Sequence, residues 1–136
     1  MEHAECKEMF DYIKDIGFYT EETAKYLFKE LLIGIQYLHK QGVVHRDLKP
    51  NNILVLKNGE GVKICDFNVA KFFDCQYKDE KNLKKIKLKM YTYTGTLAFS
   101  APEIFNVDFY TDKVDVWSAG CVLYTMLCGV QPFYHE

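Results

Sequence analysis

A polar octapeptide between two apolar runs constrains the fold of this sequence more than any other stretch. His45-Arg46-Asp47-Leu48-Lys49-Pro50-Asn51-Asn52 follows Gly42-Val43-Val44 and precedes Ile53-Leu54-Val55-Leu56. Apolar, partly β-branched runs on both sides of polar residues predict a strand, a loop and a second strand. The aspartate, lysine and asparagine are spaced closely enough to meet in one small volume. Alternatively, the octapeptide is a hairpin connection whose aspartate and asparagines only form a turn.

The composition is typical of one globular domain in a reducing compartment. The chain has 136 residues, of which 49% are apolar, so it can bury a core. Its formal charge of −2 gives no reason to expect a nucleic acid or an anionic membrane as partner. The five cysteines include no C-x-x-C pair and suit neither a disulfide framework nor a zinc site, so we expect a cytoplasmic protein. The first residues lack the apolar core of a signal peptide.

Two long helices and a hairpin are predicted around the octapeptide. Thr20 is a predicted N-cap, and apolar residues at helical spacing follow it as far as Gly42. Residues 62–64 are expected to pair with residues 53–56 through a glycine turn. Residues 113–129 are apolar nearly all round, which predicts a helix buried in a larger core that includes Cys121 and Cys128. Asp115 in this helix needs hydrogen-bond partners.

The polar residues of the octapeptide supply the set of groups that phosphoryl transfer needs: a proton acceptor, a cation beside phosphate and a metal ligand. The octapeptide resembles the catalytic loop of protein kinases, H-R-D-L-x-x-x-N, and Lys49 resembles the serine/threonine branch. Cys65-Asp66-Phe67-Asn68 resembles the metal-binding Asp-Phe-Gly motif, with Asn68 in place of glycine. Residues 91–103 resemble the end of a kinase activation segment, including its Ala-Pro-Glu motif.

Residues 1–13 resemble the hinge and the first large-lobe helix of the calcium/calmodulin-dependent and AMP-activated kinase groups. The resemblance implies an α+β fold: a kinase large, C-terminal lobe, mainly α-helical, with a small β-hairpin around the catalytic loop. It implies one partial kinase domain over residues 1–136, from the hinge through the catalytic loop and activation segment to the central helix. No Gly-rich loop or strand lysine of the small lobe occurs in the sequence, so we expect that lobe to be absent.

By the same resemblance, the function is ATP-dependent phosphorylation of protein serine or threonine, with Mg²⁺. Asp47 would accept or orient the hydroxyl proton, and Lys49 would neutralise the γ-phosphate. Thr96 would bond both Asp47 and Lys49. The metal ligands would be Asn52 and Asp66. The adenine edge would bond the backbone of Glu2 and Ala4, the ribose would bond Glu8, and Leu54 would lie under the adenine.

Regulation is also implied by the resemblance. We expect an upstream kinase to phosphorylate Thr92 first and Thr94 second, and Arg46 and Lys71 to bind the new phosphate.

Asparagine tolerates a left-handed backbone, so Asn68 is expected to leave Asp66 able to reach Mg²⁺. The lysine-rich residues 81–89 are either a solvated loop or a docking element.

Two alternatives to an active kinase stay open at this point. One is a pseudokinase or scaffold, which keeps the fold and acts through its surface. The other is a vestigial, truncated kinase that binds protein partners. The intact Asp47, Lys49, Asn52 and Asp66 favour an active parent enzyme, whereas Asn68 and the missing small lobe favour the alternatives.

Overall fold

The structure is a computed structural model that describes residues 5–57, 59–72, 86–87, 97–106 and 109–133. The helices are α1 (Met9–Ile16), α2 (Glu21–Lys40), α3 (Glu103–Asn106) and α4 (Lys113–Cys128), with short 3-10 helices η1 (Pro50–Asn52) and η2 (Leu97–Phe99). The strands are β1 (Cys6–Glu8), β2 (Val43–Val44), β3 (Ile53–Leu56), β4 (Val62–Ile64), β5 (Lys71–Phe72), β6 (Ile86–Lys87) and β7 (Phe109–Tyr110). The expected α+β mixture is confirmed.

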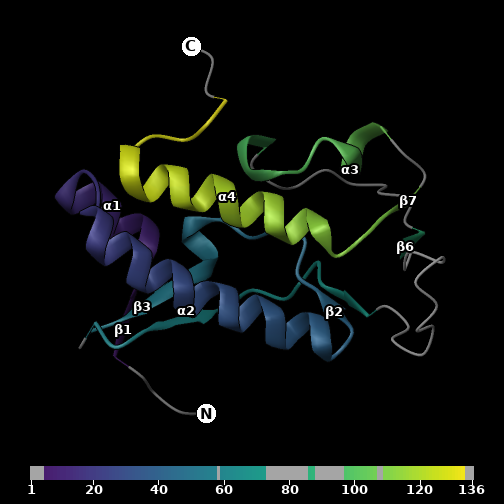
Figure 1. The fold of residues 1–136 in the computed structure, drawn as a ribbon, viewed down its shortest axis with the longest axis horizontal. Helices are drawn as coiled ribbons and strands as arrows, with labels where there is room; N and C mark the ends of the chain where they lie inside the picture. The colour runs from purple at the N-terminus through teal and green to yellow at the C-terminus, as the bar shows by residue number, and fades with distance from the viewer. Residues whose placement is uncertain (1–4, 58, 73–85, 88–96, 107–108, 134–136) are drawn as a thin grey trace.

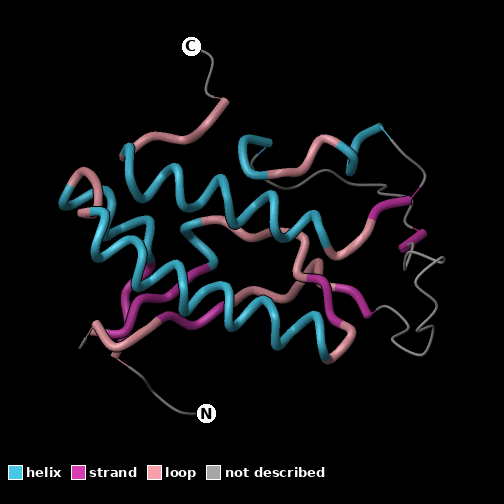
Figure 2. Tube along the Cα trace, in the orientation of Figure 1, coloured by secondary structure: helices cyan, strands magenta, loops and turns pink. Residues whose placement is uncertain are grey.

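In the described ranges the strands form three small antiparallel sheets; Figure 2 shows the strands in magenta. In the largest sheet β3 lies between β1 and β4, and β3 and β4 form the predicted hairpin. Strand β2 pairs with β5 instead, and β6 pairs with β7. Residues 45–52, hereafter the 45–52 loop, therefore connect two different sheets. This arrangement excludes a simple hairpin connection for the octapeptide.

Helix α2 begins and packs as its sequence predicts. The side-chain oxygen of Thr20 accepts a hydrogen bond from the backbone N–H of Thr23 at 3.3 Å, which satisfies one free donor of the first turn. The positions that share the inner face are buried: Ala24, Leu27, Leu31 and Ile35. The helix ends at Lys40, and Gly42 follows with a positive φ of 75° that glycine adopts without strain.

Helices α2 and α4 run antiparallel, side by side (Figure 1). The N–H of Tyr19, just before α2, donates to the carbonyl of Met126 near the end of α4 at 2.7 Å. At the other end His39 contacts Asp115. The main core lies between these helices, α1, β3 and η2. None of the helices in the described ranges is long and apolar enough to cross a membrane.

Helix α4 is less covered than predicted. One face packs on α2 and η2, but the opposite face leaves Val116, Trp117 and Tyr124 between 40% and 47% exposed. Cys121 is buried as expected. The expectation for Cys128 is wrong: it is exposed, because it lies in the last turn of α4, where Leu127 is exposed as well.

Candidate active site

Asp115 of α4 holds the backbone at the start of the 45–52 loop. Its side chain is fully buried, and its two oxygens accept the N–H groups of His45 at 2.9 Å and of Arg46 at 2.8 Å. The expectation that this carboxylate needs hydrogen-bond partners is confirmed. Arg46 has a φ of 69°, a left-handed conformation that is costly for a residue with a side chain.

Asp47 lies at the centre of a small polar cluster. Its Oδ2 atom accepts a hydrogen bond from Lys49 Nζ at 2.9 Å and from Asn52 Nδ2 at 3.0 Å. Asn52 also donates to the carbonyl oxygen of Asp47 at 2.8 Å. The Asp47 side chain nevertheless remains 23% exposed. The structure thus brings together three of the residues that the sequence analysis singles out and leaves the carboxylate accessible.

Asp66 is placed beside this cluster by backbone bonds. The N–H of Cys65 donates to the carbonyl of Asn52 at 2.9 Å, and the carbonyl of Cys65 lies 3.0 Å from Nε2 of His45. The rings of His45 and Phe67 meet edge to face at 4.9 Å, although Phe67 remains 43% exposed. These contacts fix the residues on both sides of Asp66 against the 45–52 loop.

The backbone of residues 65–68 differs from the expectation in which residue is left-handed. The left-handed residue is Asp66, with a φ of 62°, and Asn68 has no positive φ. Asp66 tolerates this conformation because its carboxylate bonds the backbone locally: Oδ1 accepts the N–H of Asn68 at 3.3 Å. Replacement of glycine by Asn68 therefore costs no backbone strain in this conformation.

The oxygen atoms at Asn52 and Asp66 suit Mg²⁺. Asn52 uses its amide nitrogen for Asp47, so its amide oxygen is the atom that can ligate a cation. Asp66 is exposed, and Mg²⁺ prefers such oxygen ligands and keeps several waters. Across the described ranges, no three His, Cys, Asp or Glu side chains group closely enough to hold a metal by themselves. A cation here would depend on Asn52, Asp66 and further oxygens.

Cys65, the residue before Asp66, is a partly buried thiol. Burial raises the pKa of the Cys65 thiol, and the nearby carboxylates of Asp66 and Glu8 raise it further. Cys65 therefore remains a neutral thiol at neutral pH.

Two of the predicted nucleotide-binding residues are cross-strand neighbours. Glu8 of β1 lies opposite Leu54 of β3. Asn51 of the 45–52 loop donates to the Glu8 carboxylate at 3.4 Å. The structure thus places Glu8 and Leu54 next to the loop. Glu2 and Ala4 lie outside the described residues.

Arg46 contacts protein groups on two sides. Nη1 donates to the Tyr110 hydroxyl at 3.0 Å, and Nη2 donates to the carbonyl of Val69. Burial raises the pKa of Tyr110, although the hydrogen bond from Arg46 lowers it. Within the described part of the chain, the buried Nε of Arg46 has no hydrogen-bond partner. Lys71 is exposed on β5, opposite Val44.

Three predicted site residues of the activation segment, Thr92, Thr94 and Thr96, lie outside the described residues. Their roles as phosphosites and as a partner of Asp47 stay predictions.

A sequence model described as the protein kinase domain matches residues 1–136, the whole chain. The chain belongs to the protein kinase family, in its serine/threonine branch. It is 43% identical to a probable myosin light chain kinase of Dictyostelium discoideum over 95% of its length. It is 39% identical to human calcium/calmodulin-dependent protein kinase type IV over 95% and 38% identical to an SNF1-related kinase catalytic subunit of Arabidopsis thaliana over 100%. The chain covers only about a quarter of each relative.

His39 is a residue beside the candidate site that sequence reasoning missed. It lies in the last turn of α2, and its Nε2 atom is 2.8 Å from Oδ2 of Asp115. The signal in the sequence was indirect: Asp115, in an apolar helix, required partners, but nothing in the spacing pointed to a histidine on another helix.

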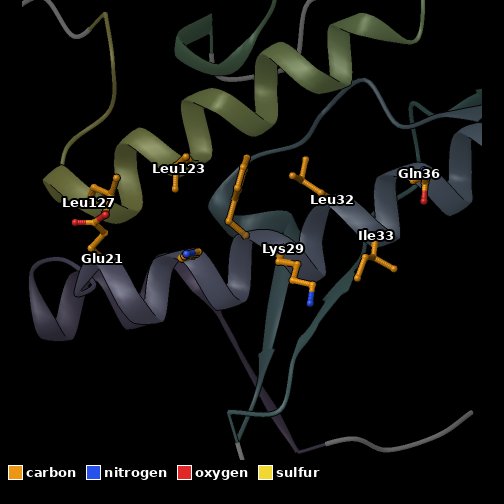
Figure 3. Close-up of a pocket in the computed structure, with 9 residues that line it drawn as sticks. Glu21, Lys29, Leu32, Ile33, Gln36, Leu123 and Leu127 are labelled. Carbon is orange, nitrogen blue, oxygen red and sulfur yellow. The ribbon is translucent and has the colours of Figure 1, made fainter.

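Cavities lie beside the helices in the described part of the chain. One of about 260 Å³ borders the 45–52 loop at Pro50 and Asn51, and none of its lining residues is charged. The other, of about 600 Å³, is a groove lined by α2 and α4; Figure 3 shows Leu32 and Ile33 on α2 and Leu123 and Leu127 on α4. No residue of the 45–52 loop lines this second groove, so it is separate from the candidate active site.

Proposed function

We propose that the protein transfers the γ-phosphoryl group of ATP to a serine or threonine hydroxyl of a protein substrate. This chain is then the part of the large, C-terminal lobe that carries the catalytic loop. The single observation that carries the proposal is the cluster in which Lys49 and Asn52 both bond Asp47. The exposed apolar face of α4 supports membership of a larger lobe, since such side chains are favoured when covered.

Asp47 is the proposed proton acceptor. A carboxylate that is held by two donors but still exposed can orient a substrate hydroxyl and accept its proton. The hydroxyl oxygen forms a bond to the γ-phosphorus, the bond from that phosphorus to the ADP oxygen breaks, and the proton passes to Asp47. Lys49, whose Nζ atom lies 2.9 Å from Oδ2 of Asp47, is the proposed donor to the transferred phosphoryl oxygens.

The nucleotide is proposed to lie over β1 and β3. Glu8 is the candidate for the ribose hydroxyls, Leu54 for the underside of the adenine, and the backbone of Glu2 and Ala4 for its edge. The amide oxygen of Asn52 and the carboxylate of Asp66 are the proposed ligands of Mg²⁺. When bound, Mg²⁺ would neutralise charge on the phosphates.

The experiment uses the complete protein, ATP labelled at the γ-phosphate and peptides that differ only in a serine, threonine or tyrosine acceptor. We expect label on the serine and threonine peptides when Mg²⁺ is present and none when the metal is chelated. Label on the tyrosine peptide alone would contradict the proposed substrate class.

The same measurements distinguish an active kinase from a pseudokinase or scaffold and from a vestigial kinase. Mg²⁺-dependent ATP binding without transfer to any peptide, after treatment with activating kinases, would overturn the proposal in favour of a pseudokinase or scaffold. Loss of both binding and transfer in the folded protein would favour a vestigial kinase that acts only through protein partners.

A further inference from the structure

The cavity of about 260 Å³ shares a wall with the 45–52 loop. Pro50 and Asn51 form this wall, and in the sequence they stand between the two residues whose side chains bond Asp47. None of the described residues proposed to bind ATP or Mg²⁺ lines the cavity. The cavity is therefore adjacent to the candidate active site and is not used by the proposed nucleotide and metal sites.

Three elements complete the cavity around this wall. Ile13 of α1, Phe99 of η2 and Thr125 of α4 are buried and supply its innermost lining. Phe10 and Val130 line it as well and are 39% and 59% exposed, so the cavity opens to solvent on their side. Its volume lies below the roughly 300 to 1,000 Å³ of pockets for small-molecule ligands. A single amino-acid side chain therefore suits it better than a cofactor.

The lining offers no charge to a bound group. Its polar side chains are those of Asn51, Thr125 and Gln131. The Thr125 hydroxyl donates to the carbonyl of Cys121 at 2.9 Å, and the Asn51 amide donates to the carboxylate of Glu8, which is outside the lining, at 3.4 Å. A guanidinium or carboxylate inside the cavity would lose hydration without gaining a partner of opposite charge. An aliphatic side chain would gain from the burial of its apolar surface.

From this geometry we propose that the cavity is a substrate-specificity pocket: it takes an aliphatic side chain that flanks the acceptor serine or threonine and rejects charged side chains there. Asn51 in its wall is next to Asn52, which bonds Asp47, so the pocket is only a few residues of extended substrate away from the acceptor. The pocket stands on the cavity and its lining, whereas its effect on phosphorylation rests on the proposed function.

A new charge in the complete protein tests the pocket. Gln131→Glu places a carboxylate in the wall of the cavity. Gln36→Glu, the same change at an exposed residue of α2 outside this cavity, is the matched control. The substrates are peptides with one serine acceptor, in which each flanking position carries leucine, arginine or aspartate in turn.

For the wild type we expect one flanking position at which kcat/KM is about tenfold higher with leucine than with arginine or aspartate. In Gln131→Glu the arginine peptide should gain about tenfold relative to the leucine peptide at that same position, because the new carboxylate pairs with the guanidinium. Gln36→Glu should keep the wild-type ranking. The affinities of the same peptides, measured by fluorescence anisotropy, should follow the same order without any transfer of phosphate.

Arginine peptides that the wild type binds and uses as well as leucine peptides at every position would overturn the proposal. The same gain for arginine in both variants would also overturn it, since that gain would be an effect of net charge. If the affinities separate Gln131→Glu from Gln36→Glu but no peptide is phosphorylated, the pocket is supported and the proposed function fails.

Discussion

Asp47 and Asp115 are carboxylates with opposite surroundings. Asp115 is fully buried, and its oxygens are occupied by two backbone N–H groups and His39. Asp47 bonds Lys49 and Asn52 through one oxygen and remains partly exposed. A carboxylate whose acceptor sites are filled stabilises the backbone, whereas one with a free, accessible oxygen can accept a proton. The structure therefore separates a positioning carboxylate from a candidate catalytic one.

The buried hydroxyl of Tyr19 leads to a prediction about the stability of the fold. Its ring is buried, and its buried hydroxyl has no hydrogen-bond partner among the described residues. Because an unsatisfied buried hydroxyl is destabilising, Tyr19→Phe is expected to leave the free energy of unfolding at pH 7 unchanged or to raise it by about 1 kcal/mol. Urea denaturation of both forms measures the difference. A loss of more than about 1 kcal/mol would mean that the hydroxyl is stabilising.

The free energies of unfolding of the wild type and of Tyr19→Phe should also depend differently on pH. Burial raises the pKa of Tyr19 to about 12, above the ordinary value of 10.0. Between these two values the unfolded chain releases the proton while the folded chain keeps it, so the stability of the wild type falls as the pH rises. Tyr19→Phe lacks this contribution, and its advantage over the wild type should grow from pH 10 to pH 12. A constant difference would show that the hydroxyl titrates normally.

Helix α4 is anchored at both of its ends. Near its start Asp115 holds the 45–52 loop, and after its end Gly129 adopts a φ of 74° and donates to Thr125 at 2.9 Å. A Cβ atom at Gly129 would lie 2.3 Å from the carbonyl oxygen of Gly17, the residue that ends α1. The close approach of these two helix ends therefore requires a glycine.

We predict that Gly129→Ala lowers the free energy of unfolding by about 2 kcal/mol or more, because it adds both a left-handed alanine and a backbone clash. Gly120→Ala is the matched control within α4: among the described residues, no atom outside the adjoining helix backbone and the two chain neighbours lies within 4 Å of its Cβ position. In this helix interior, alanine should stabilise by roughly 0.5 to 1 kcal/mol. Chemical denaturation measures both, and equal effects would contradict the role of the Gly129–Gly17 contact.

The molecule as a whole shows which structural features local sequence patterns can predict. The hairpin, both long helices and the meeting of Asp47, Lys49 and Asn52 could be predicted, because each depends on residues close together in the sequence. The bond from His39 to Asp115 could not, since it depends on how two distant helices pack. The left-handed Asp66 and the exposed Cys128 were missed for a related reason: backbone conformation and the coverage of a helix end are set by tertiary neighbours.

The most direct test of the proposed catalytic role of Asp47 compares ATP binding with phosphate transfer in the Asp47→Asn variant of the complete protein. The substitution keeps the size of the side chain but removes the proton acceptor, so we predict ATP affinity within about threefold of wild type and transfer slower by about 10² to 10⁴. Asp15→Asn, the same change at an exposed residue of α1 paired with Lys7, should leave both unchanged. Near-normal transfer by Asp47→Asn would contradict the catalytic role of Asp47.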